Sequence, residues 1–178
     1  MNLFFERMLR AAKLDAALFE EVEADRGAMG QAVGVVVLSS LAAGIGNAEQ
    51  MGAGVLIIGT LAALVAWYLW ALLTYLIGTR ILPTPQTRAD VGELLRTIGF
   101  SSSPGLIRIL GVIPALRTIV FVVAGVWMLV SMVIAVRQAL DYESTLRALG
   151  VCFIGWIIQA VILAVVLALT GVQLTPTQ

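Results

Sequence analysis

The sequence predicts an all-α membrane protein, a bundle of five transmembrane helices whose third member is irregular and broken by proline. Of its 178 residues, 60% are hydrophobic and only 12% are charged, whereas average soluble domains contain roughly 25% charged residues. Charged side chains are missing from four long runs, which are residues 27–48, 50–79, 118–136 and 148–178. A helix needs about 20 apolar residues to cross the hydrocarbon core of a bilayer. Four spans are therefore nearly forced, and a fifth is possible.

The chain divides into three parts by composition. Residues 1–27 are expected to form a charged, amphipathic cytoplasmic segment, residues 28–171 the five-span membrane domain, and residues 172–178 a short uncharged tail. Neither an internal repeat nor a linker between two domains is evident in the sequence. We therefore expect one membrane domain with a short segment at the surface.

The N-terminal segment, residues 2–26, has the periodicity of an amphipathic helix. One side of the helical wheel is apolar, and it holds Phe4, Met8, Ala11, Ala12, Phe19 and Val22. The other side is charged, and it holds Glu6, Arg7, Arg10, Lys13, Glu20 and Glu21. This pattern favours a helix lying at the membrane surface. The alternatives are a soluble helix packed on the spans and a partly frayed tail.

Four of the spans are uninterrupted apolar sequence, expected at about Ala28–Gly46, Gly54–Thr79, Thr118–Val136 and Leu149–Thr170. The first of them carries small residues in pairs four positions apart, and these are Gly30, Gly34, Ser40 and Gly44. Small residues let helix backbones approach closely in lipid. This face either packs against another span of the same chain, which we favour, or contacts other membrane proteins.

The remaining span, Leu94–Leu116, is apolar but interrupted by polar residues. Asp90 and Glu93 precede it and suit a helix N-terminus. Ser103–Pro104 is a second favourable helix start, because serine caps free N–H groups and proline at the first position loses no hydrogen bond. The sequence therefore allows two half-helices, one ending near Phe100 and one starting at Pro104.

This break is the candidate binding site. The second half-helix would direct its positive end at the break, and two nearby arginines could help to bind an anion, such as a lipid phosphate or an acidic partner residue. The candidate residues are Arg96, Gly99, Phe100, Ser101, Ser102, Ser103, Pro104 and Arg108. A proline-kinked helix explains the same residues, with serines bonded to their own backbone and Arg108 either extended to the interface or paired with an acidic residue. We favour this structural interpretation.

Several classes of function are excluded by residues that are missing. The chain has no histidine, which removes Ser-His and Cys-His catalysis, most zinc sites and haem ligation. The four uninterrupted spans hold no ionisable acid, which argues against an ion-coupled pump. The single cysteine, Cys152, is expected to be a small buried hydrophobe. We expect no enzyme, catalytic residue, metal or cofactor, and no basic patch for nucleic acid.

Orientation follows from the basic residues. With five spans and the N-terminus inside, the inner face holds Arg7, Arg10, Lys13, Arg26, Arg80, Arg88, Arg96, Arg137 and Arg147. The outer face then holds Arg117 alone, so the sequence favours a cytoplasmic N-terminus and an outward C-terminus. A re-entrant Leu94–Leu116 would place Arg137 and Arg147 outside. Residue usage indicates a bacterial cytoplasmic membrane.

A charged N-terminus, closely spaced spans and three motifs together resemble the Yip family of Ypt-interacting membrane proteins, bacterial members in particular. The motifs are Leu14-Asp15, Phe19-Glu20-Glu21-Val22-Glu23-Ala24-Asp25 and Leu95-Arg96-Thr97-Ile98-Gly99-Phe100, the last continuing through Ser101-Ser102-Ser103-Pro104. The resemblance covers roughly residues 14–170. It implies a multispan membrane protein without known catalysis, linked in eukaryotes to vesicle traffic and membrane shaping. The eukaryotic Asp-Leu-Tyr-Gly-Pro element is missing here, so only Gly99, Phe100 and Pro104 inherit a functional expectation.

Two hypotheses of function follow. The first is a non-enzymatic membrane scaffold or adaptor, which acts through helix packing and the loops on the inner face. The second is transport or handling of a small anion or a lipid headgroup, using the break at Ser101–Pro104 with Arg96 and Arg108. The lipid bilayer is the one expected partner common to both.

Overall fold

Long apolar helices dominate the structure. The computed structural model describes residues 2–47 and 53–170, and all regular structure in these ranges is helical. Four stretches are long and apolar enough to cross a membrane, and these are Arg26–Gly46, Leu56–Ile81, Pro114–Ala139 and Thr145–Ile162. The four uninterrupted spans that the sequence predicts are thereby confirmed as apolar helices of spanning length. The expected 172–178 tail lies outside the described residues.

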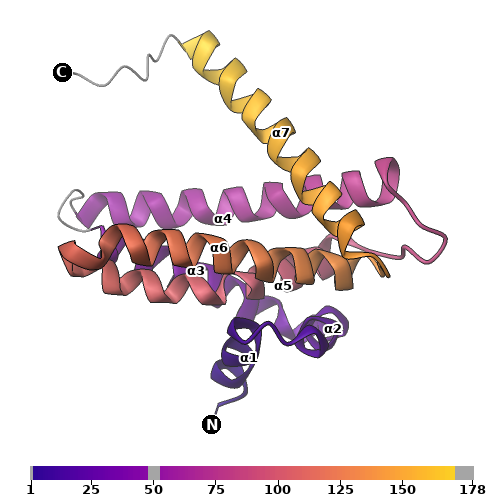
Figure 1. Ribbon diagram of the computed structural model, residues 1–178, viewed down its shortest axis with the longest axis horizontal. Helices are drawn as coiled ribbons and strands as arrows, with labels where there is room; N and C mark the ends of the chain where they lie inside the picture. Colours follow the sequence, from indigo (N-terminus) through magenta and orange to yellow (C-terminus); the bar gives the residue numbers. More distant parts are fainter. Residues whose placement is uncertain (1, 48–52, 171–178) are drawn as a thin grey trace.

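The spanning stretches fall on four named helices. These are α3 (Met29–Gly46), preceded by the short 3-10 turn η1 (Arg26–Ala28), α4 (Ala53–Leu76), which continues as the π-helical turn η3 (Ile77–Ile81), α6 (Pro114–Ala139) and α7 (Thr145–Thr170). Figure 1 shows α3, α4 and α6 running side by side, whereas α7 starts at one end of α6 and diverges from the other helices. The bundle is therefore closed along three helices and partly open beside α7.

The interrupted stretch forms two helices of different type. α5 (Val91–Ser101) is an α-helix, and η4 (Ser103–Val112) is a 3-10 helix that follows it. The expected helix start at Asp90 and Glu93 is confirmed as a capping box, because each side chain accepts a hydrogen bond from the other's backbone N–H. Both helices pack on α3 and α6. Figure 1 shows them following one another along the bundle toward the start of α6.

The N-terminal segment is two helices rather than the single helix that its periodicity favours. α1 (Leu3–Ala12) and α2 (Ala16–Ala24) are joined by a tight turn. Leu14 adopts a positive φ of 63° in this turn, and the Asp15 carboxylate accepts a hydrogen bond from the Ala17 N–H, which starts α2. The resulting hairpin packs on α5 and α6, on the opposite side of the bundle from α7 (Figure 1). The packed alternative, not an isolated surface helix, describes this segment.

Two buried clusters hold the helices together. The first joins α4, α5, α6 and α7, and it includes Cys152, which is free and 2% exposed, as expected for a small buried hydrophobe. The second joins the hairpin to α3, α5 and α6 around Phe19 and Phe100, both fully buried. Because the second cluster draws on both α1 and α2, the hairpin is an integral part of the folded domain.

The outer surface of the long helices is apolar. Side chains that are 57–69% exposed include Ile57, Ile58 and Leu61 of α4, Ile119, Val122 and Val126 of α6, and Phe153, Val161 and Ile162 of α7. Soluble proteins rarely expose contiguous apolar surface of this extent. These helices therefore contact the lipid bilayer.

The small-residue face of α3 is occupied by the chain itself at three of its four positions. A Cβ on Gly34 would lie 3.4 Å from the Phe4 ring, and one on Gly44 would lie 2.3 Å from a Leu56 methyl. Ser40 lies 3.2 Å from the Thr60 hydroxyl. Gly30 alone has open space around it. This arrangement matches the intrachain packing favoured for that face.

Candidate functional site

The junction between α5 and η4 is tightly packed. The Ser101 hydroxyl donates to the Ile98 carbonyl at 2.7 Å, so this serine bonds its own helix. Ser102 precedes η4, but its side chain makes no capping hydrogen bond there. Pro104 occupies the first turn of η4 and is buried with Ser103, whose hydroxyl has no partner among the described residues. The chain therefore changes from an α-helix to a 3-10 helix here, and the junction is packed rather than open.

The residues that carry the family resemblance are packing residues here. A Cβ on Gly99 would lie 2.7 Å from the Ala32 Cβ, so only glycine lets α5 approach α3 this closely. Phe100 fills the core beneath the hairpin. A Cβ on Gly105 would meet the Ser39 hydroxyl at 2.2 Å. The close approach at Gly99 positions α5 against α3, and the one at Gly105 positions η4 against α3.

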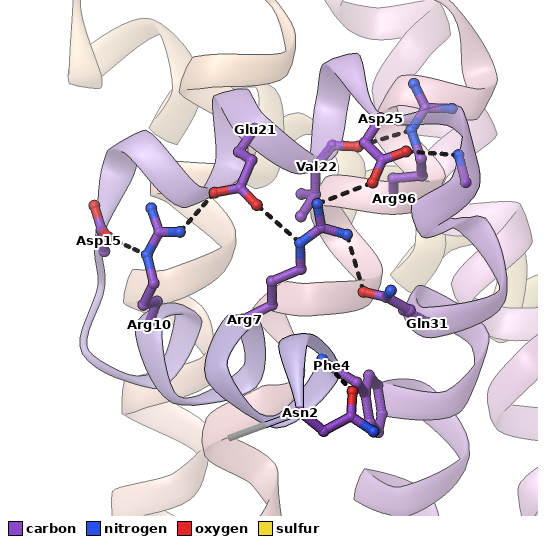
Figure 2. Close-up of polar contacts among 11 residues, drawn as sticks. Asn2, Phe4, Arg7, Arg10, Asp15, Glu21, Val22, Asp25, Gln31 and Arg96 are labelled. Carbon is purple, nitrogen blue, oxygen red and sulfur yellow. Dashed lines mark hydrogen bonds and ion pairs between the residues drawn. The ribbon is translucent and has the colours of Figure 1, made fainter.

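Arg96 faces the hairpin and not the junction. Arg96 is 5% exposed, and its Nε donates to the Val22 carbonyl at 2.8 Å while Nη2 donates to the Glu23 carbonyl. Figure 2 shows this side chain beside the end of α2. Arginine suits this position, because it satisfies the terminal carbonyls of α2 and its charge complements the helix dipole. Arg96 therefore joins α5 to the hairpin.

Arg108, in η4, bonds to α3 and not to the hairpin. Its Nη2 donates to the Ser39 carbonyl at 3.0 Å and to the Ser39 hydroxyl at 2.8 Å, and Nε donates to the Gly105 carbonyl. The ion pairs of the described chain do not include Arg108. Of the two arginines near the break, only this one faces the interior of the bundle.

A cavity of about 600 Å³ adjoins Arg108. It is bounded by α3, α4, α6 and α7. Two residues of the predicted site line it, Ser102 and Arg108. The lining does not include the other predicted residues, which are Arg96, Gly99, Phe100, Ser101, Ser103 and Pro104. Its other polar side chains are Ser39, Ser40, Asn47 and Gln159. The predicted residues therefore do not form one site. Arg96 joins α5 to the hairpin, Ser102 and Arg108 line the cavity, and the others are packing residues.

The hairpin holds a charged network that periodicity did not predict. Arg7, expected on the solvent face, is 5% exposed and forms 2.9 Å ion pairs with Glu21 and Asp25 and a 3.0 Å hydrogen bond to Gln31. Arg10 pairs with Asp15 and Glu21 (Figure 2). The wheel missed this network because it assumed one helix, whereas a turn at Leu14 folds two charged faces together.

These ion pairs hold the carboxylates in their charged form. Hydrogen bonding from Arg10 lowers the pKa of Asp15, and bonds from Arg10 and then Arg7 lower the pKa of Glu21 against an opposing effect of burial. A bond from Arg7 likewise lowers the pKa of Asp25. At neutral pH these ion pairs therefore hold α1 and α2 together.

A second cavity, about 780 Å³, is acidic. Three distant segments converge on it, and its charged residues are Glu20, Glu23, Glu93, Arg137, Asp141 and Glu143. Burial and then repulsion from Glu93, Asp141 and Glu20 raise the pKa of Glu23 to about 7. Within the described part of the chain, no three His, Cys, Asp or Glu side chains are placed to hold a metal ion. The sequence pattern does not predict this cavity, because its acidic residues are far apart along the chain.

Comparison with known proteins identifies the family. A family model described as the Yip1 domain matches residues 17–167. A search of curated proteins and a search of solved structures found no match. The matched segment begins in α2, ends in α7 and includes the junction and both cavities. Together with four helices that are able to cross a membrane, this match shows that the chain is an integral membrane protein belonging to the Yip family.

Proposed function

We propose that the protein is a non-enzymatic scaffold or adaptor of the bacterial cytoplasmic membrane. The observation that supports this is the acidic surface at one end of the bundle, built from α2, the start of α5 and the loop after α6. Hydrogen bonds tie the hairpin to α6, from the Trp127 indole to the Ala12 carbonyl at 2.8 Å and from Gln138 to Glu20 at 2.6 Å. A surface fixed in this way presents the same set of charges to any partner.

The proposal includes five passes, with the N-terminus inside and the C-terminus outside. α5 and η4 have lengths of 11 and 10 residues, about 35 Å in all at their respective rises, and the hydrocarbon core is about 30 Å. The loops after η3 and after α6 lie at the same end of the bundle (Figure 1). Arg80, Arg88, Arg137 and Arg147 belong to these two loops and their borders, as expected for an inner face.

Cysteine labelling tests this topology in a Cys152→Ser background. Single cysteines at Arg117 and Ser144 would be exposed in intact cells to a membrane-impermeant thiol reagent. Labelling at position 117 but not at 144 is expected for five passes. The opposite pattern would mean that α5 and η4 enter and leave on one side, which would overturn the orientation.

Photo-crosslinking tests the adaptor role. A photoreactive side chain at Gln86 or Glu143, both exposed at the acidic cavity, should give discrete protein adducts in cells. Tyr68 is the matched control, because it is exposed on the apolar surface of α4. The adducts should be lost when Glu93→Lys and Asp141→Lys are combined. Lipid adducts alone, at all three positions, would refute the adaptor function.

A second candidate function is the handling of an anion or lipid headgroup. It is supported by Arg108, which lies at the 600 Å³ cavity and has no carboxylate paired with it among the described residues. For this second function, Arg108 and Ser102 contact the anion, whereas Arg96 holds the hairpin on α5.

A further inference from the structure

Arg108 extends toward the middle of the bundle. Its backbone carbonyl lies against Gly46, the last residue of α3, where an added Cβ would be 1.9 Å from the Arg108 oxygen. Its guanidinium bonds Ser39, seven residues earlier in α3 and about 10 Å along the helix axis. Arginines near the end of a span usually extend to the water interface. This one turns away from the nearer helix end.

The guanidinium has spare capacity for an anion. Its Nε and Nη2 bond to neutral oxygens, and within the described ranges Nη1 donates to no group. The four apolar runs of the sequence contain no acidic residue. A second copy of the chain therefore has no acidic side chain in these spans to offer at this depth. Carbonyls satisfy two of its nitrogens, but no described carboxylate neutralises its charge, so this position suits an anion from another molecule.

The cavity has the shape of a groove for an acyl chain. Along α4 its lining runs from Leu56 to Trp70, about 21 Å, which exceeds the roughly 15 Å thickness of one leaflet. Most of the remaining lining is apolar, including Val36, Phe121, Met128, Met132 and Trp156. The groove therefore places one cation beside a long apolar surface.

The groove opens sideways toward lipid. α7 touches both α4 and α6, and Figure 1 shows it diverging from them toward its C-terminal end. Gly59, Ala66 and Gln159 line the groove and are exposed. Trp70 also lines it, and its indole N–H is buried without a partner among the described residues. A lipid could enter between α4 and α7 without crossing the packed core.

We propose that this groove is a lateral binding site for an anionic phospholipid. The lipid phosphate pairs with Arg108, and one acyl chain lies along α4 between α6 and α7. Charge complementarity selects this occupant, since the groove supplies the cation and the chain's own spans supply no anion. The inference deepens the second candidate function and rests on it, and it is independent of the adaptor surface.

Lipid titration followed by native mass spectrometry tests the proposal on the delipidated full chain. Phosphatidylglycerol should bind one molecule per chain, and Arg108→Gln should weaken binding at least tenfold. Arg117→Gln, the same change in the arginine whose Nε donates to the Gly111 carbonyl, should leave binding unchanged. Phosphatidylcholine, which has no net charge, should bind more weakly than phosphatidylglycerol.

A second pair of variants tests the groove without changing its charge. Gly59→Leu places a side chain in the groove, and Gly54→Leu places the same side chain on α4 beyond its lining. A Cβ at either position has no neighbour within 4 Å, so both variants should fold. Gly59→Leu should block phosphatidylglycerol binding, whereas Gly54→Leu should not.

Three results would overturn the proposal. Equal binding by wild type and both test variants would place the lipid elsewhere. Inorganic phosphate that displaces the lipid at comparable concentration would indicate a site for free anions. A dimer that Gly59→Leu converts to a monomer, without lipid binding, would assign the groove to a second copy. Crosslinking at Gln86 and Glu143 would report on the adaptor function separately.

Discussion

Glu23 is expected to make the docking of the hairpin depend on pH. It lies at the end of α2, half-buried at the acidic cavity, where it faces Glu20, Glu93 and Asp141. Arg96 also lies nearby and opposes their effect in part, while its Nη2 bonds the Glu23 carbonyl. Replacing Glu23 by glutamine removes the charge and keeps the shape of the side chain.

The sign of the effect follows from the direction of the shift. The pKa of Glu23 is raised from 4.5 to about 7 in the folded protein. Below pH 4.5 the Glu23 carboxyl is neutral whether or not the hairpin is docked, so it does not change the free energy of docking. Between pH 4.5 and 7 the docked state keeps a proton that the undocked state releases, and the stability of docking therefore falls as pH rises.

The magnitude is moderate. The full shift would correspond to at most about 3 kcal/mol. Because Glu23 is only half-buried, solvent screening reduces this to roughly 1–2 kcal/mol. Above pH 7 the penalty is constant, so Glu23→Gln should stabilise docking by that amount at pH 8 and by almost nothing at pH 4.5.

Hydrogen–deuterium exchange of the α2 amides in nanodiscs measures the effect. After correction for intrinsic exchange, wild-type protection should fall between pH 5 and 8, while Glu23→Gln should stay level and exchange roughly 5- to 30-fold more slowly at pH 8. Glu6→Gln, at an exposed carboxylate of α1, should follow the wild type. Equal stabilisation by Glu23→Gln at both pH extremes would refute the electrostatic explanation.

Two further predictions concern packing and the charged network. Arg7→Met removes three polar bonds of a buried arginine and should destabilise the packing of the hairpin by about 1.5–3 kcal/mol. Faster tryptic cleavage after the exposed Lys13 would report this loss. Unchanged cleavage would show that the network does not hold α1 in place. Gly99→Leu should lower thermal stability by about 1–3 kcal/mol because its Cβ would meet Ala32 at 2.7 Å, whereas Gly54→Leu, with open space, should stay within about 0.5 kcal/mol.

Much of the helical content could be predicted because it depends on local sequence. Transfer of a helix into lipid is a sum over consecutive residues, so the runs at 27–48, 50–79, 118–136 and 148–178 predict spanning helices directly. The helix start at Asp90 and Glu93 is likewise local, since both partners lie within one turn. Neither result needs information on which helices are neighbours.

The candidate site was predictable in position but not in its contacts. Arg96 and Arg108 are predicted to lie near one break, because they are twelve residues apart on an apolar stretch. The structure directs them to different neighbours, Arg96 to the carbonyls of α2 and Arg108 to Ser39 of α3. Which way each side chain points depends on where α2 and α3 pack, and these helices lie more than 60 residues away in the chain.

The sequence by itself determined that this chain enters a membrane, how its apolar helices are spaced, and that it lacks histidine chemistry, because these properties depend only on composition and short-range pattern. The tertiary structure decided the hairpin turn at Leu14, the burial of Arg7, the acidic cavity around Glu23 and the inward direction of Arg108. The last three are contacts between segments that are separated along the chain, and the turn at Leu14 brings the first of these segments together. Burial and charge pairing are set by which segments meet in space, and local periodicity does not specify that.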